Sequence, residues 1–229
     1  MIYALIAVVF LALMFGPQMW VRYVIAEHAD DRPDFPGTGG ELARHLLDEA
    51  GLDQVPVEVL PADGGDHYDP VAKAVRLSPS NHDGRSVTAV AIAAHEVGHA
   101  MQDADGYRPL ALRTRMATAA QKIQGIGSIL LIGAPVVMAL TRKPSILLIE
   151  IGAGLTIMAT GVLVHLITLP VEYDASFSRA LPILKHGEYL RKDDLPGAKK
   201  VLRAAALTYV AAAMVSLLDV MRWLRLLRF

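Results

Sequence analysis

The sequence contains no cysteine. Disulfide bonds and thiolate metal sites are therefore excluded, and any bound metal ion must use histidine, aspartate or glutamate side chains. The absence of cysteine also fits a chain that faces the cytoplasm, where disulfides are rare.

The sequence also lacks an excess of positive charge. Lys and Arg together number 22 against 23 Asp and Glu, which gives a formal net charge of -1. No nucleic-acid partner is therefore expected. Apolar side chains, in contrast, make up 53% of the chain and raise its mean hydropathy to +0.38, more than an ordinary soluble domain shows.

The apolar residues are concentrated in four runs. The first begins at the start of the sequence and ends near Arg22, and the others span Ile123–Leu140, Ser145–Leu169 and Ala204–Leu218. A helix needs about 20 mostly apolar residues to cross a bilayer. The runs therefore predict about four transmembrane helices, the last only if its flanks are included. The first run has neither the basic start nor the cleavage site of a signal peptide, which favours an uncleaved anchor.

The polar segment 26–122 predicts a small α+β insertion. "TGGELARHLLDEAGL" is typical of an amphipathic helix, with Thr38 and Glu41 at capping-box spacing. Two strands are expected at Val55–Leu60 and Lys73–Ser78, separated by a loop that contains "DHYDP". The second strand fits either a plain hairpin or an edge on which a peptide lies. The predicted fold is a mainly α membrane protein with this insertion.

The stretch "AVAIAAHEVGHAMQ", residues 89–102, places polar side chains in an otherwise apolar helix. Ser86 is its predicted N-cap, and its end is expected between Asp103 and Gly106. Buried charges need partners, and "HEVGH" is an H-E-x-x-H motif whose histidines share one helix face. This spacing predicts a zinc site in which the intervening glutamate takes a proton from a zinc-activated water. Gly98 would allow close packing of another element.

A catalytic zinc site needs a third protein ligand. The candidates are Glu172, Asp174, His67, His82, Asp103 and His165. Pro170 suits the first turn of a helix, so Glu172 would lie near a helix N-terminus, where a carboxylate is favoured even without metal. Asp174 would point about 200° away from Glu172 on a regular helix. It could support the site only if the segment departs from that geometry.

The "DHYDP" segment offers further candidates for the chemistry. His67 and Tyr68, with the aspartates beside them, could donate a hydrogen bond to a transition state. They could equally order a turn next to Gly64 and Gly65.

Four segments occur in the order "DHYDP", "VRLSPS", "AAHEVGHAMQ" and "LPVEYDAS" among the hydrophobic runs. In this the chain resembles the YugP-type neutral zinc metallopeptidases of bacterial membranes and, more distantly, gluzincins such as the HtpX-type membrane proteases. The resemblance implies an endopeptidase with one Zn²⁺ per chain, His95 and His99 as ligands, Glu96 as base and Glu172 as third ligand. Many gluzincins have E-x-x-x-D, whose aspartate supports a zinc histidine; here Ser176 stands at that place.

The resulting prediction is a membrane-anchored zinc endopeptidase that acts on peptides or proteins. The alternatives are a non-catalytic zinc-binding or scaffolding membrane protein, or a site-2-type intramembrane protease. The predicted location is a multi-pass protein of the bacterial plasma membrane, with the catalytic side placed in the cytoplasm by the positive-inside rule. The predicted segments are an anchor (1–25), a zincin-like domain with the HExxH helix (26–122), a transmembrane hairpin (123–169), a helical segment with the third ligand (170–203), and a last transmembrane helix with an interfacial arginine tail (204–229).

Overall fold

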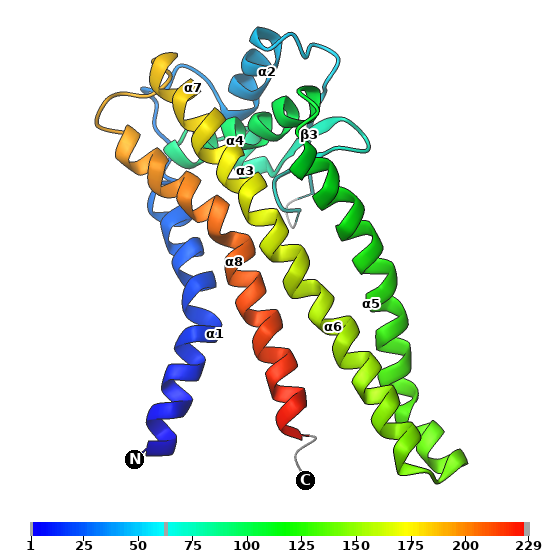
Figure 1. The fold of residues 1–229 in the computed structure, drawn as a ribbon. Helices are drawn as coiled ribbons and strands as arrows, with labels where there is room; N and C mark the ends of the chain where they lie inside the picture. Colours follow the sequence, from blue (N-terminus) through cyan, green and yellow to red (C-terminus); the bar gives the residue numbers. More distant parts are fainter. Residues whose placement is uncertain (1, 62–63, 227–229) are drawn as a thin grey trace. The chain divides into compact units, whose positions relative to one another are not determined.

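The computed structural model describes residues 2–61 and 64–226, and the order of its elements can be followed in Figure 1. The helices are α1 (Ile2–Glu27), α2 (Gly39–Glu49), α3 (Pro79–His82), α4 (Val87–Ala104), α5 (Arg108–Thr141), α6 (Pro144–Tyr173), the π-helix η1 (Asp174–Ala180), α7 (Leu181–His186) and α8 (Leu195–Leu226). The strands are β1 (Val57–Val59), β2 (His67–Asp69) and β3 (Ala74–Leu77). The chain is therefore mostly helical with one small sheet, as predicted.

The chain divides into two compact units. Unit 1 comprises Met1–Phe15, Leu112–Thr168 and Tyr209–Phe229, and unit 2 comprises Gly16–Ala111 and Leu169–Thr208. The sheet, the motif helix α4 and the π-helix all belong to unit 2.

The parts of α5 and α6 that belong to unit 1 form a helical hairpin. Their connection is Arg142 and Lys143, inside the segment 123–169 expected to form a hairpin. Arg142 adopts a left-handed backbone conformation with φ of 51°.

The transmembrane prediction is wrong. The apolar runs do form long helices, α1, α5, α6 and α8, but length alone does not make a membrane span, because about 20 consecutive residues must be predominantly apolar. Over the residues that the structure describes, no helix combines the length and the apolar character that crossing a bilayer requires. The predicted multi-pass topology is therefore not supported either. The predicted arginine tail extends to Arg228, which lies outside the described residues.

Helix α4 forms the centre of unit 2. Every residue from Val87 to Ala100 is buried, and the helix packs against α2, the sheet, η1 and α7. The core to which α4 belongs includes the fully buried side chains of Leu46, Leu47, Leu77 and Leu184. A helix surrounded on all sides explains why its sequence is apolar on every face except at the motif.

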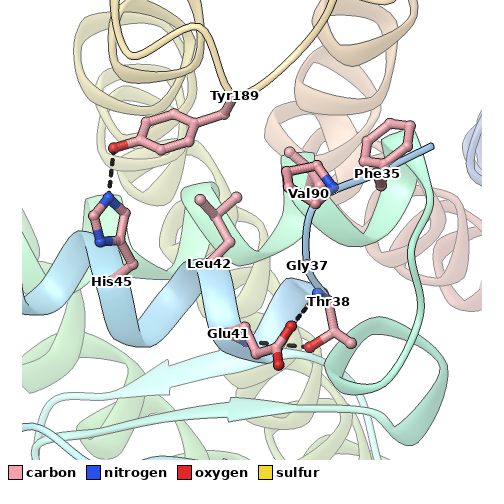
Figure 2. Close-up of a pocket in the computed structure, with 9 residues that line it drawn as sticks. Phe35, Gly37, Thr38, Glu41, Leu42, His45, Val90 and Tyr189 are labelled. Carbon is pink, nitrogen blue, oxygen red and sulfur yellow. Dashed lines mark hydrogen bonds between the residues drawn. The ribbon is translucent and has the colours of Figure 1, made fainter. Parts of the chain in front are cut away.

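The helix boundaries in unit 2 follow the local signals in the sequence. The Ser86 hydroxyl accepts a hydrogen bond from Ala89 N at 3.1 Å, and α4 ends at Ala104, so the predicted start and end of the motif helix are confirmed. The predicted capping box of α2 is also present, since Thr38 and Glu41 each accept a hydrogen bond from the other's backbone N–H (Figure 2).

The sheet differs from the prediction in its order. The strands run β1-β3-β2, with β1 parallel and β2 antiparallel to β3. The segment expected to be a hairpin or edge strand, β3, is therefore the central strand, and "DHYDP", expected to be a loop, supplies the edge strand β2. Three residues are too few to show strand alternation, so pairing with β3 defines β2 and its own sequence does not.

Candidate metal centre

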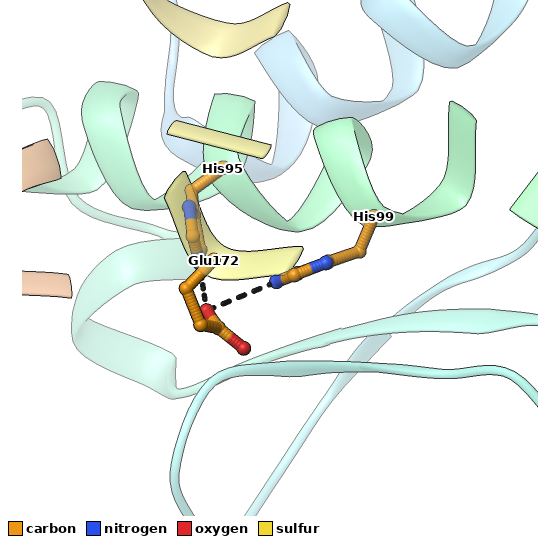
Figure 3. Close-up of side chains that lie close together, drawn as sticks. All are labelled: His95, His99 and Glu172. Carbon is orange, nitrogen blue, oxygen red and sulfur yellow. Dashed lines mark hydrogen bonds and ion pairs between the residues drawn. The ribbon is translucent and has the colours of Figure 1, made fainter. Parts of the chain in front are cut away.

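Three ionisable side chains meet in the interior of unit 2. His95 and His99 lie one turn apart on α4, with ring centroids 4.7 Å apart. Their Nε2 atoms lie 3.2 and 3.3 Å from Oε2 of Glu172, near the end of α6 (Figure 3). One potential ligand atom from each of the three residues lies within 4.8 Å of the others. The structure thus brings together the three residues that the motif and the resemblance indicated.

The three side chains are almost completely enclosed. Glu172 is 2% exposed, and both histidines are 4% exposed. Burial alone would raise the pKa of Glu172, but the contacts with His99 and His95 outweigh it and hold this pKa below its usual value. Glu172 therefore keeps its negative charge in the protein interior, and this charge favours a cation beside the carboxylate.

The ring of His95 is held by Ser176. The Ser176 hydroxyl lies 3.0 Å from His95 Nδ1 and donates to the Leu202 carbonyl at 3.1 Å. Because a hydroxyl has one proton and a carbonyl only accepts, Nδ1 of His95 must donate to Ser176. A serine thus occupies the place where the gluzincin pattern often has an aspartate.

The ring of His99 is held by Gln102. Gln102 Nε2 donates to the Val171 carbonyl at 2.9 Å and to Asp174 Oδ2 at 2.8 Å. Its oxygen must then face His99 Nδ1, 2.9 Å away, so that nitrogen carries a proton.

With both Nδ1 atoms protonated, the Nε2 atoms are left for a metal ion. Neutral imidazole with one carboxylate is a preferred ligand set for zinc. In the metal-free site a proton on Nε2 would fill the space toward Glu172, and metal binding would release it. Burial lowers the pKa of His99, but Glu172 outweighs this effect and the pKa lies above its usual value. The residues present therefore fit a zinc ion.

Glu96 lies between the two histidines in the sequence and is also buried. Its Oε2 accepts a hydrogen bond from the Tyr68 backbone N–H at 2.8 Å, which ties it to the edge strand β2. Burial raises the pKa of Glu96; His95 and His99 oppose this shift, whereas Glu172 adds to it. A raised carboxyl pKa brings the group closer to the value that suits a general base near neutral pH.

Glu172 belongs to a segment whose geometry differs from the prediction. Pro170 does not start a helix: it lies within α6, which continues to Tyr173 and passes directly into the π-helix η1. A helix tolerates an internal proline where neighbouring groups compensate for the missing donor. The argument that Glu172 is favoured by a helix N-terminus is therefore wrong, and its contacts with the histidines account for its charge.

The segment after Glu172 is not a regular α-helix, which is the condition under which Asp174 could support the site. Asp174 Oδ2 accepts from Gln102 and, at 2.9 Å, from Arg179 Nε. Arg179 also donates to Asp105, beyond the end of α4, at 2.6 Å. Asp174 thus contacts a residue that holds a histidine, and it is not among the group of possible metal ligands.

Gly98 allows η1 to lie against α4 beside the histidines. A Cβ atom at this position would meet the Ala175 carbonyl oxygen at 2.9 Å and Ala175 Cα at 3.4 Å. The close packing expected at Gly98 is therefore present, and its partner is the backbone of the π-helix. π-Helical turns inside α-helices are frequent at functional sites.

The other predicted candidates lie elsewhere. His67 is exposed and bonds to the Gly65 carbonyl, and His82 bonds to Asp83. The Tyr68 hydroxyl donates to Asp103 at 2.7 Å, and burial raises its pKa, so it stays protonated. His165 belongs to unit 1. Within residues 2–61 and 64–226, the one group able to hold a metal is His95, His99 and Glu172.

Sequence reasoning missed the role of Gln102. It stands three residues after His99, a spacing that places two side chains on the same helix face, so its hydrogen bond to the ring could have been anticipated. Its contacts with Val171 and Asp174 could not, because they join residues far apart in the chain.

The chain is similar to known proteins over almost its whole length. Residues 3–228 match a family described as "Putative neutral zinc metallopeptidase". The chain belongs to this family. A similar protein of Bacillus subtilis (strain 168), named "Putative membrane protease YugP", is 38% identical over 223 residues, which cover 97% of this chain and 95% of that protein. The resemblance to YugP-type proteins drawn from the motifs is therefore confirmed, and no solved structure was found to match the chain.

The packing of this metallopeptidase-family chain at Gly98 predicts the effect of a single methyl group. Gly98→Ala should lower the free energy of unfolding by about 1–3 kcal/mol, because the Ala175 backbone must move to admit the Cβ atom. Urea unfolding of the purified protein measures this.

Gly125→Ala is the matched control, since a Cβ at Gly125 of α5 meets no atom within 4 Å. This control should unfold like the wild type or up to about 1 kcal/mol less readily, as alanine favours helix. Equal stability of the two variants would show that the contact with η1 does not constrain the site.

Proposed function

We propose that this protein is a zinc-dependent endopeptidase with one Zn²⁺ per chain, held by His95, His99 and Glu172. The observation that carries the proposal is the convergence of both Nε2 atoms on the Glu172 carboxylate. Membership of a family described as zinc metallopeptidases supports the same conclusion.

When bound, a zinc ion supplies Lewis acidity for the attack of water on a peptide carbonyl. Glu96 takes the proton from that water and gives it to the departing amine, the usual work of a general acid–base carboxylate. The Tyr68 N–H fixes one Glu96 oxygen at 2.8 Å and so orients the carboxylate for this transfer. Ser176 and Gln102 keep the protons of the two histidines on Nδ1.

The alternative is a protein that binds zinc without turnover. Glu96 argues against it, since metal binding alone requires no acid between the histidines. Burial raises the pKa of Glu96, which means that burying its charge costs free energy, and a protein that only binds zinc would gain nothing in return.

One test of the proposed function separates metal binding from catalysis. Glu96→Gln should keep about one zinc per chain while peptide hydrolysis falls at least about 100-fold, because a general base typically contributes 100- to 10,000-fold. His95→Ala and His99→Ala should lose both zinc and activity. Metal analysis and cleavage of a peptide library measure the two properties, and a fully active Glu96→Gln protein would contradict the mechanism.

Another test concerns the third ligand. Glu172→Ala should weaken zinc binding severely, because it removes the carboxylate that both Nε2 atoms face. Asp174→Ala should retain zinc with a partial loss of activity, since Asp174 contacts Gln102 and Arg179 instead. Competition with a chelator measures the affinity of each variant. Zinc lost in Asp174→Ala and kept in Glu172→Ala would reverse the assignment.

We also propose that the protein associates with a lipid bilayer, as the name of the Bacillus subtilis relative says of that protein. In unit 1, α5 exposes large apolar side chains at helical spacing, among them Ile126, Ile129 and Val136, each at least 58% exposed. An exposed apolar stripe of this kind marks a surface for lipid or protein.

Its test replaces these three α5 residues by lysine. The wild type should sediment with membranes and be released by detergent, whereas the triple variant should move to the soluble fraction. Thr118→Lys with Gln121→Lys, at exposed polar positions of the same helix, is the control and should behave like the wild type. A triple variant that still sediments would overturn the assignment of this surface.

A further inference from the structure

Gln102 is a fully buried amide that neither binds the metal nor transfers a proton in the proposed reaction. Its side chain is 0% exposed, although it is polar and belongs to the largely apolar helix α4. An amide buried without hydrogen bonds costs a few kcal/mol, so a position like this is stable only if its donors and its acceptor are all used.

All of these groups are used, and the orientation of the amide is forced. The Val171 carbonyl and the Asp174 carboxylate only accept hydrogen bonds, so both must face Nε2. The reversed amide would place its oxygen against two other acceptors. The Gln102 oxygen therefore faces His99, and one amide group determines which nitrogen of that histidine is protonated.

The same amide is hydrogen-bonded to residues on both sides of Glu172 in the sequence. Val171 precedes Glu172 by one residue, and Asp174 follows it by two, so the two acceptors belong to the segment that carries the third ligand. Arg179 Nε also donates to Asp174 Oδ2, at 2.9 Å. Gln102 is thus hydrogen-bonded to one ligand on α4 and to both flanks of the ligand on α6.

We propose that Gln102 is the positioning residue that aligns His99 with Glu172, so that the ligands from two elements form a single metal site. This inference rests on the proposed function. Positioning differs from simple stabilisation, because it predicts a change at His99 and in zinc affinity while His95, held separately by Ser176, keeps its proton on Nδ1.

The test uses Gln102→Met, which keeps the volume of the side chain and removes its hydrogen bonds. Zinc affinity, measured by chelator competition, should fall about 10- to 100-fold, the range found when a partner of a metal-ligating histidine is lost. The ¹⁵N imidazole signals of histidine-labelled protein should show mixed tautomers for His99 and an unchanged Nδ1–H tautomer for His95.

Two control variants separate positioning from stability. Thr88 lies on α4, as Gln102 does, and its hydroxyl donates to the Ile25 carbonyl of α1 at 2.8 Å. Thr88→Val removes this hydrogen bond away from the metal site, so it should destabilise the fold and leave zinc affinity unchanged. Asp174→Asn keeps an acceptor for Gln102 and should change zinc affinity less than about threefold. If Gln102→Met fails to fold, Gln102→Asn, one methylene shorter, takes its place with the same expected direction.

The outcomes distinguish the two proposals. A wild-type protein that binds no zinc overturns the proposed function and this inference together. A wild type that binds zinc, with Gln102→Met binding it equally tightly and His99 unchanged, overturns the role of Gln102 alone. Equal losses of affinity in Gln102→Met and Thr88→Val would show a structural role and would also reject it.

Discussion

Two backbone carbonyl oxygens, those of Val171 and Leu202, can only accept hydrogen bonds, and the protonation of the site depends on this constraint. The Leu202 carbonyl takes the Ser176 proton, so His95 must donate from Nδ1. The Val171 carbonyl takes an amide proton of Gln102, so His99 must also donate from Nδ1. Both Nε2 atoms consequently face the Glu172 carboxylate. Two fixed backbone carbonyls thus determine which nitrogen of each histidine carries the proton.

The packing of unit 2 serves the same geometry. Helix α4 is enclosed, so the histidines lie in a medium of low dielectric constant, which strengthens their interaction with Glu172. Gly98 lets the backbone of η1 approach α4, and this approach carries Ser176 to His95. The change from α- to π-helical geometry at Asp174 alters the direction of the side chains that follow Glu172. Asp174 can therefore support Gln102 although it is only two residues from a candidate ligand.

The sheet contributes to the site through its edge. Strand β2 pairs with β3, and the Tyr68 N–H of this edge strand reaches the Glu96 carboxylate. The Tyr68 side chain is used differently, since its hydroxyl donates to Asp103 at the end of α4. One residue thus joins the edge strand to α4 at two points, and its backbone, not its phenol, contacts the proposed base.

The sequence by itself determined the features that depend on neighbours along the chain. Ser86 and Thr38 started the predicted helices because a cap acts on backbone groups within three residues, and the spacing of His95 and His99 set their shared face through helix periodicity. The hydropathy of the runs predicted long helices correctly, but it did not decide membrane crossing. Only the tertiary structure decided the strand order, the π-helical turn after Pro170, and the contacts of Glu172, Ser176 and Gln102. These contacts join residues about 70 to 80 positions apart, and no local pattern records which carbonyl or carboxylate a buried side chain will meet.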